Sequence, residues 1–132
     1  MPWLRYQKQA DPDSVAFFEQ GLRNHTRVSE LVDLGNQTYR VIRVQPHGSI
    51  DVYLTNHYIL GEAQLDEILN EAPDVDAVVT ISGYNSYSKH AKEMGRDRGV
   101  GVFKYGEFLG ALNHDGDAFV DYIAPERDKK RR

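Results

Sequence analysis

The sequence lacks several residue types and patterns, and each absence excludes a class of protein. None of its 132 residues is a cysteine, which excludes a disulfide framework, a thiolate zinc site and catalysis by a cysteine nucleophile. It has no apolar run of about 18 residues, the length that a membrane-spanning helix needs. It also begins without the basic and apolar segments of a secretory leader. From these absences we expect a cytoplasmic protein with no membrane partner.

The composition is that of a folded, water-soluble chain. Apolar residues make up 40% and charged residues 27% of the sequence, and the length suits one domain with a modest core. The formal net charge of −4 argues against strong nonspecific binding to a polyanion over the whole surface. We predict a single domain over residues 1–124 and a flexible basic tail over residues 125–132, which ends in Lys129-Lys130-Arg131-Arg132.

The clearest apolar pattern lies between Val75 and Leu112, where it predicts a strand, a helix, a strand and a helix in succession. Ala77 to Ile81 is a β-branched run typical of a strand buried on both faces. Tyr87, Ala91 and Met94 recur with helical spacing. Two strands joined by a helix imply a parallel pair with a right-handed crossover. The remaining boundaries are a helix cap at Asn85 or Ser86, a helix end at Gly99, a strand from Val100 to Phe103 and a helix from Glu107 to Leu112.

The front of the chain predicts a helix followed by an antiparallel meander. Asp11-Pro12 is a typical helix start. Turn residues then separate three short β-rich segments, and such short connections favour antiparallel neighbours. A further helix precedes the strand at Ala77, and a last strand follows the final helix. The predicted ranges are strands over Glu30 to Leu34, Tyr39 to Val44 and Ser49 to Thr55, a helix over Glu62 to Glu71 and a strand over Ala118 to Ile123.

Together these elements predict an α/β fold with one mixed sheet, in which an antiparallel meander is followed by a parallel crossover and helices flank both faces. This order resembles the restriction-endonuclease-like superfamily, whose core runs α-β-β-β-α-β, and in particular the Mrr-type catalytic domain. The resemblance covers roughly Glu30 to Leu112. It is carried by Val78-Val79-Thr80-Ile81, Tyr87-Ser88-Lys89-His90-Ala91, Val100-Gly101-Val102-Phe103 and Glu107-Phe108-Leu109.

The catalytic chemistry of that superfamily lies in the meander. A carboxylate near the second strand and an acidic-x-Lys triplet on the third strand bind a divalent metal and position the attacking water. The resemblance places Asp51 at the acidic position of the triplet, but Tyr53 stands where the family has lysine. The second strand offers Arg40 and Arg43 and no carboxylate, so Asp33 is the nearest upstream acid. The resemblance thus implies a degenerate site, with Asp51 and Asp33 as catalytic and metal-binding residues and Mg²⁺ or Mn²⁺ as cofactor only if cleavage occurs.

Two further interpretations depend on the same resemblance: a face that contacts nucleic acid and an alternative alignment of the catalytic motif. A basic face formed by Arg40, Arg43 and Lys89 would contact the phosphates of a nucleic acid. An alternative alignment takes Asp51 as the first acid and Glu62-Ala63-Gln64 as the triplet, but it places Glu62 at the start of a helix instead of in a strand.

The turn after Ile81, residues 83–89, predicts a different kind of site. Open α/β sheets bind ligands at the carboxyl ends of their strands, and free N–H groups at a helix start attract anions. Tyr84 and Tyr87 are placed to stack on a base. Alternatively, the polar residues of the turn only satisfy the first N–H groups of the helix. The candidate phosphate ligands are Asn85, Ser86, Ser88 and Lys89.

Two smaller groups of residues have weaker patterns. His47, Asp51 and His57 lie within eleven positions, and imidazole with carboxylate can bind a metal. His114-Asp115-Gly116-Asp117 is similar to part of a cation-binding loop but lacks the remaining ligands, so a plain turn is the favoured interpretation.

Two classes of function follow. The first is a restriction-endonuclease-like domain with a degenerate site that acts on or with nucleic acid; the resemblance alone gives its setting, defence against foreign DNA or evasion of that defence. The second is a non-enzymatic module that binds a protein partner or a second copy of itself, for which eight tyrosines and one tryptophan supply interface aromatics. A sensor of a small nucleotide at the turn 83–89 is a third hypothesis.

Overall fold

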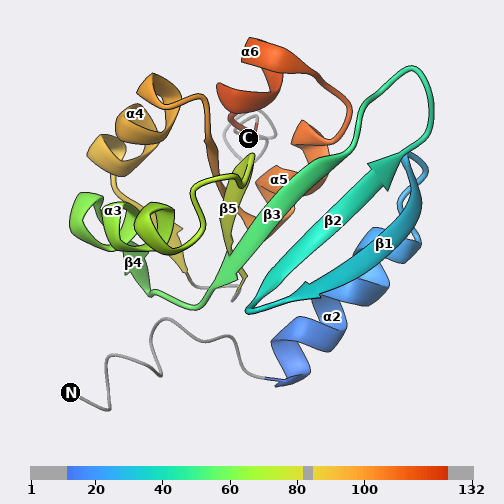
Figure 1. Cartoon of the computed structure of the whole chain (residues 1–132), viewed down its shortest axis with the longest axis horizontal. Coiled ribbons are helices and arrows are strands. Elements are labelled where there is room, and N and C mark those ends of the chain that lie inside the picture. Colours follow the sequence, from blue (N-terminus) through green and yellow to red (C-terminus); the bar gives the residue numbers. More distant parts are fainter. Residues whose placement is uncertain (1–11, 82–84, 125–132) are drawn as a thin grey trace, which may run out of the picture.

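A five-stranded mixed sheet forms the centre of the protein (Figure 1). The computed structural model describes residues 12–81 and 85–124. The basic tail predicted for residues 125–132 therefore lies outside the described residues. In order across the sheet, the strands are β1 (Val28–Gly35), β2 (Thr38–Arg43), β3 (Ile50–Thr55), β5 (Ala77–Thr80) and β7 (Gly101–Lys104).

The strand directions confirm the predicted α/β fold class. β1 pairs with β2 and β2 with β3 in antiparallel fashion, whereas β3 pairs with β5 and β5 with β7 in parallel. The antiparallel meander and the parallel crossover thus belong to one sheet. Because β2 alone runs in the opposite direction, the carboxyl ends of β1, β3, β5 and β7 meet at the same edge of the sheet.

Helices cover both faces of this sheet (Figure 1). We call the side that bears Tyr39 and Val52 the α2 face and the side that bears Tyr53 and Val78 the α3 face. The α2 face is covered by α2 (Pro12–Arg23), α5 (Tyr105–Ala111) and α6 (Gly116–Val120), and the α3 face by α3 (Glu62–Glu71) and α4 (Lys89–Asp97). A second, two-stranded sheet pairs β4 (Ile59–Leu60) with β6 (Ser86–Tyr87) in parallel.

Alternation along the strands divides the apolar side chains between two cores. In β3, Val52 and Leu54 enter the core on the α2 face, and Tyr53 enters the core on the α3 face. This is the result of the period of two in a β-strand. Phe18 of α2 and Phe108 of α5 stack in the first core with their ring centroids 6.2 Å apart. None of the helices among the described residues is long and apolar enough to cross a membrane.

The start of α4 differs from the sequence-based expectation. Ser88, not Asn85 or Ser86, is the N-cap, and its Oγ accepts a hydrogen bond of 3.1 Å from the Ala91 amide. Tyr87, predicted on a helical face, instead lies in β6 opposite Leu60. The physical reason is that the second sheet pairs the residues just before the helix, so the first turn begins later in the chain.

The predicted strand over Ala118 to Ile123 is wrong, because this segment begins as part of helix α6. Phe119 explains the difference. Its ring lies 5.2 Å from the ring of Phe103 and 6.4 Å from that of Phe108, in edge-to-face contacts. A helical turn brings Phe119 over the first core, and this packing outweighs the strand propensity of the local sequence.

Candidate functional site

A cavity of about 240 Å³ opens between α2 and the hairpin that joins β1 to β2. We call it the hairpin pocket. It lies at the edge where β1 and β3 have their carboxyl ends, which is the edge at which open α/β sheets bind ligands. The sequence brings α2 to this place through the apolar stripe of Phe18 and Leu22, both fully buried. The residues that line the hairpin pocket are Val15, Asp33, Gly35, Asn36, Gln37, Tyr39 and Leu54.

The hairpin turn forms a fixed wall of this pocket. Asn36 and Gln37 have φ angles of +52° and +64°, a left-handed conformation that costs about 1 kcal/mol or more for residues other than glycine. Two hydrogen bonds hold Gln37 in place, because its Nε2 donates to the Leu54 carbonyl at 2.8 Å and its own carbonyl accepts from the Leu54 amide at 2.8 Å. The turn is thereby attached to β3 as well as to β2.

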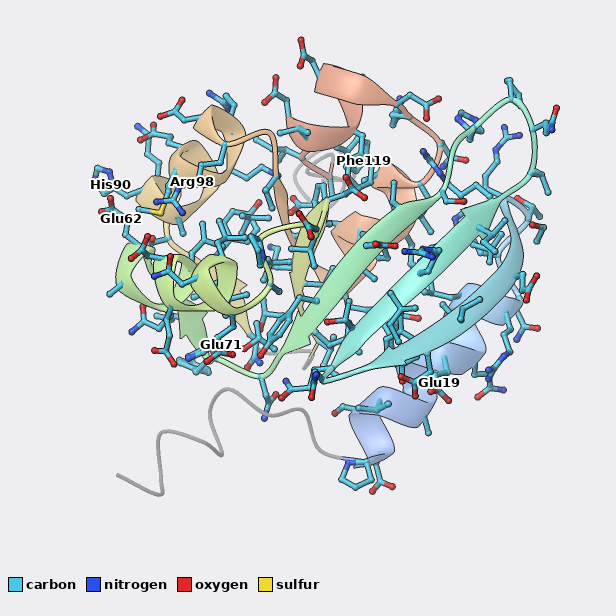
Figure 2. The ribbon with its side chains drawn as sticks, viewed as in Figure 1. Glu19, Glu62, Glu71, His90, Arg98 and Phe119 are labelled. Carbon is cyan, nitrogen blue, oxygen red and sulfur yellow. The ribbon has the colours of Figure 1, made fainter. Side chains whose placement is uncertain are left out.

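One carboxylate lines the pocket and a second lies beside one of its lining residues. Asp33 lines it, and one of its oxygens, Oδ1, accepts a hydrogen bond of 2.8 Å from the Gly35 amide. Glu19 of α2, the helix that passes behind β1 in Figure 2, is not a lining residue but adjoins the pocket through Tyr39, whose hydroxyl donates to it at 2.5 Å. Burial, this hydrogen bond and the charges of Glu19 and Asp33 together raise the pKa of Tyr39 well above its ordinary value. The phenol therefore stays protonated and donates.

The structure does not bring Asp33 and Asp51 together. Asp33 is opposite Tyr39 in the β1–β2 register, whereas Asp51 is opposite Arg40 in the β2–β3 register. Residues that are paired across strands share a face, and neighbours along a strand do not. Asp33 thus belongs to the α2 face and Asp51 to the α3 face. The prediction that both bind one metal is wrong, because the sheet lies between their carboxylates.

The other positions of the expected nuclease site are also occupied differently. Tyr53, where the resembled family has lysine, is 4% exposed in the core on the α3 face. Asp51 holds Arg40, with Nε 2.9 Å from Oδ1 and Nη2 3.2 Å from Oδ2. Glu62, considered as part of an alternative triplet, begins helix α3. Within residues 12–81 and 85–124, no group of three or more acidic or histidine side chains could hold a metal ion.

Arg43 does not belong to the predicted phosphate-binding face, because its side chain is buried. It is 6% exposed and bridges two loops under α6. Its Nε donates to the Gly48 carbonyl at 2.8 Å, its Nη1 to the carbonyls of Leu112 and His114 at 3.1 and 2.7 Å, and its Nη2 to Asp115 at 2.7 Å. Four of the five N–H donors of this guanidinium are thus used inside the protein, and the side chain is buried, so Arg43 does not belong to an exposed phosphate-binding face. Of the three predicted cations, Arg40 and Lys89 remain exposed.

Two of the four phosphate ligands predicted in the turn 83–89 are used for the protein's own structure. Asn85 is buried and donates from Nδ2 to Asn56 at 3.1 Å, and Ser88 caps α4. The Tyr87 hydroxyl donates to Glu107 at 2.7 Å, and its half-buried ring packs against the core on the α3 face, so it is not an open stacking surface. Ser86 is half-buried and Lys89 exposed, while Tyr84 lies outside the described residues. For Asn85 and Ser88 the capping and packing interpretation describes this turn better than the phosphate interpretation.

The proposed set of His47, Asp51 and His57 does not form either, because β3 separates its members. His47 precedes the strand and its Nδ1 is hydrogen-bonded to Asp115. His57 follows the strand and is buried, with Nδ1 2.7 Å from the Thr55 hydroxyl. Asp115, one of the two acids between His114 and Asp117, pairs with His47 and Arg43.

One titratable cluster escaped the sequence-based prediction. Lys92, which follows Ala91 in α4, is 5% exposed and donates to the carbonyls of Val102 and Tyr122 at 2.8 and 3.0 Å. Its ammonium lies 4.2 Å from the ring centroid of Phe103. Burial lowers its pKa to about 8, although the charge of Glu107 opposes this shift. Helical periodicity does not predict the burial of this side chain, because a lysine next to Ala91 is expected at the exposed edge of the apolar face of α4.

Comparison of the chain with protein-family models, with curated proteins and with solved structures finds no match. The function must therefore be inferred from the geometry and charge of this chain.

Proposed function

We propose that this chain is a restriction-endonuclease-like domain without a working nuclease centre, and that it acts by binding a protein partner. The element order α2, β1, β2, β3, α3, β5, interrupted only by the two-residue β4, supports the architecture. One observation carries the loss of catalysis: Asp51 is paired with Arg40 on one face of the sheet, while Asp33 lies on the other. The resemblance alone supplies the setting, defence against foreign DNA or its evasion.

Charge favours a protein over a nucleic acid as the partner of the folded domain. Between residues 12 and 124 the sequence has 17 acidic and 9 basic side chains, a formal net charge of −8. Several exposed arginines face acids at hydrogen-bonding distance: Arg96 lies 2.7 Å from Asp121, and Arg98 lies 2.9 Å from Asp66. A phosphate backbone would meet net repulsion at such a surface.

The cleavage assay tests the catalytic half of this proposal. Purified protein is incubated with supercoiled plasmid, single-stranded DNA and RNA in Mg²⁺ or Mn²⁺, beside the variants Asp51→Ala and Asp33→Ala. We expect no cleavage above that of a mock preparation in any of the three. Metal-dependent cleavage by the wild-type protein that disappears in Asp51→Ala would refute the proposal.

A second candidate function, contact with nucleic acid through the tail, is favoured by the block from Lys129 to Arg132. We expect any DNA binding to be weak, to fall steeply with salt, and to vanish when these four residues are replaced by serine. Gel-shift titrations of both proteins at 50 and 200 mM salt measure this. Equal affinity of the two proteins for DNA would show that the acidic domain itself binds, and would contradict the preference for a protein partner.

A further inference from the structure

We infer that the hairpin pocket receives the guanidinium group of an arginine side chain presented by the partner. This inference depends on the proposed function in one respect, since it takes the partner to be a protein. It adds the chemistry by which that partner is recognised and the place where it binds.

The size of the pocket favours a small occupant. Sites for drug-sized molecules and cofactors have volumes of roughly 300 to 1,000 Å³, whereas the hairpin pocket measures about 240 Å³. A nucleotide would project far outside it. A single extended side chain fits, provided that its head group matches the polar end of the cavity.

The polar end calls for a cation with directed donors. Asp33 is exposed, and only its Oδ1 is hydrogen-bonded to a described residue, the Gly35 amide. Glu19 adds a second negative charge beside Tyr39, and Arg23, which lies 3.7 Å from Glu19, is itself 60% exposed. Carboxylates bind the planar fork of a guanidinium through paired N–H donors.

The remaining lining suits the stem of the same side chain. Val15 of α2 and Leu54 of β3 are apolar lining residues, and the methylene groups of arginine bury favourably against such surfaces. Tyr39 contributes an aromatic wall and a protonated hydroxyl already directed to Glu19. A divalent metal would fit less well, because the two carboxylates are not part of any larger metal-binding group among the residues that the structure describes.

Peptide titration tests the inference on the full chain. The probes are Ac-Gly-Arg-Gly-NH₂, the same peptide with lysine or with the neutral isostere citrulline, and free arginine. Amide chemical shifts of the ¹⁵N-labelled protein give the dissociation constants. We expect the arginine peptide to bind with a constant on the order of 1 mM and the citrulline peptide about tenfold more weakly, because citrulline loses the charge-assisted hydrogen bonds. Free arginine should also bind more weakly, since its own carboxylate faces an acidic pocket.

Two variants locate the binding site. Asp33→Asn removes the charge but keeps an oxygen for the Gly35 amide, and Val15→Phe fills the cavity but keeps both carboxylates. Asp97→Asn at the end of α4 is the matched control, with the same change in charge at an exposed site outside the pocket. We expect the first two to weaken the arginine peptide at least tenfold and the control to have no effect. Thermal unfolding shows whether each variant is folded.

Each outcome bears on one claim. Unchanged binding in both pocket variants, or equal binding of the arginine and citrulline peptides, overturns the arginine pocket and leaves the absence of nuclease activity standing. Tighter binding of the lysine peptide overturns the guanidinium assignment. Metal-dependent cleavage overturns the proposed function whatever the peptides do.

Discussion

The guanidinium of Arg40 meets the carboxylate of Asp51 at two points, Nε to Oδ1 at 2.9 Å and Nη2 to Oδ2 at 3.2 Å. The two residues are directly paired across β2 and β3, so the sheet register itself brings them together. The hydrogen bond to Asp51 and the charge of Asp51 raise the pKa of Arg40 above its ordinary value. A metal ion at Asp51 would have to displace this guanidinium and would find no acid from Asp33 on the same face.

Restoring the lysine of the resembled family should not restore its chemistry. Tyr53→Lys places an ammonium in the core on the α3 face, where Tyr53 is 4% exposed. Because an unpaired buried charge is strongly unfavourable, we expect a loss of about 3 kcal/mol or more in the free energy of unfolding. Urea denaturation measures the loss, with Tyr53→Phe as the milder control. Wild-type stability of the lysine variant, or newly gained cleavage, would contradict this expectation.

Arg43 is expected to act in stability and not in binding. Arg43→Ala leaves the carbonyls of Gly48, Leu112 and His114 without their donor, and we expect a loss of about 3 kcal/mol in the free energy of unfolding. Arg43→Lys should recover little, because an ammonium cannot span the same partners. In chemical denaturation, Arg40→Lys serves as the control and should leave the midpoint nearly unchanged. A harmless Arg43→Ala would refute the loop-bridging role.

Lys92 should give the protein an unusual pH dependence. Burial lowers its pKa from 10.5 to about 8, so between these values the unfolded chain holds a proton that the native state lacks. Unfolding then takes up a proton, and stability rises with pH. We expect a rise of about 2 kcal/mol between pH 7.5 and pH 9.5. Above pH 10 the trend should reverse, because Tyr39 and Tyr87 have raised pKa values and ionise more readily when unfolded.

Urea titrations at pH 7.5, 8.5 and 9.5 measure this dependence. Lys92→Met should flatten the profile over that range. Lys104→Met, at an exposed position, should retain the wild-type slope. A slope that is identical in all three proteins would show that Lys92 is not its source.

Two helical glycines should respond to alanine in opposite directions. A Cβ at Gly95 of α4 would lie 2.6 Å from the Val100 carbonyl oxygen and 2.7 Å from Cγ2 of Val102, whereas at Gly106 of α5 nothing lies within 4 Å. We expect Gly95→Ala to lower the free energy of unfolding by about 1 to 3 kcal/mol through overpacking. Gly106→Ala should raise it by about 0.5 kcal/mol through reduced unfolded-chain entropy. Thermal melts of both variants decide, and changes of the same sign would contradict the packing around Gly95.

Local patterns were sufficient to predict most of the fold. Leu65, Ile68 and Leu69 have helical spacing and Pro73 follows them, and α3 spans Glu62–Glu71 as predicted. The alternation in β3 and the β-branched run in β5 likewise depend on neighbouring residues alone. The segment around Phe119 shows the limit of prediction from local patterns. Its sequence is typical of a strand, but it is helical because Phe119 packs against aromatic rings of β7 and α5.

The candidate site was less predictable, because its parts come from separate elements. Asp33 was identified, but Glu19 joins it only through the packing of α2 against the sheet. The opposite faces of Asp33 and Asp51 follow from a register that two irregularities in β1 make hard to count from the sequence. The burial of Lys92 depends on the position of Tyr122, whose carbonyl accepts a hydrogen bond from Lys92. The periodicity of the α4 sequence contains no information about that distant residue.

The double attachment of Gln37 to Leu54 has a spectroscopic consequence. Leu54 is followed by Thr55, whose hydroxyl lies 2.7 Å from Nδ1 of His57. A ligand that moves the turn at Gln37 should therefore also displace Leu54 and Thr55, and with them the hydrogen bond between Thr55 and the imidazole of His57. We expect the NMR resonances of the His57 ring to shift when a ligand enters the hairpin pocket, although His57 is not one of its lining residues.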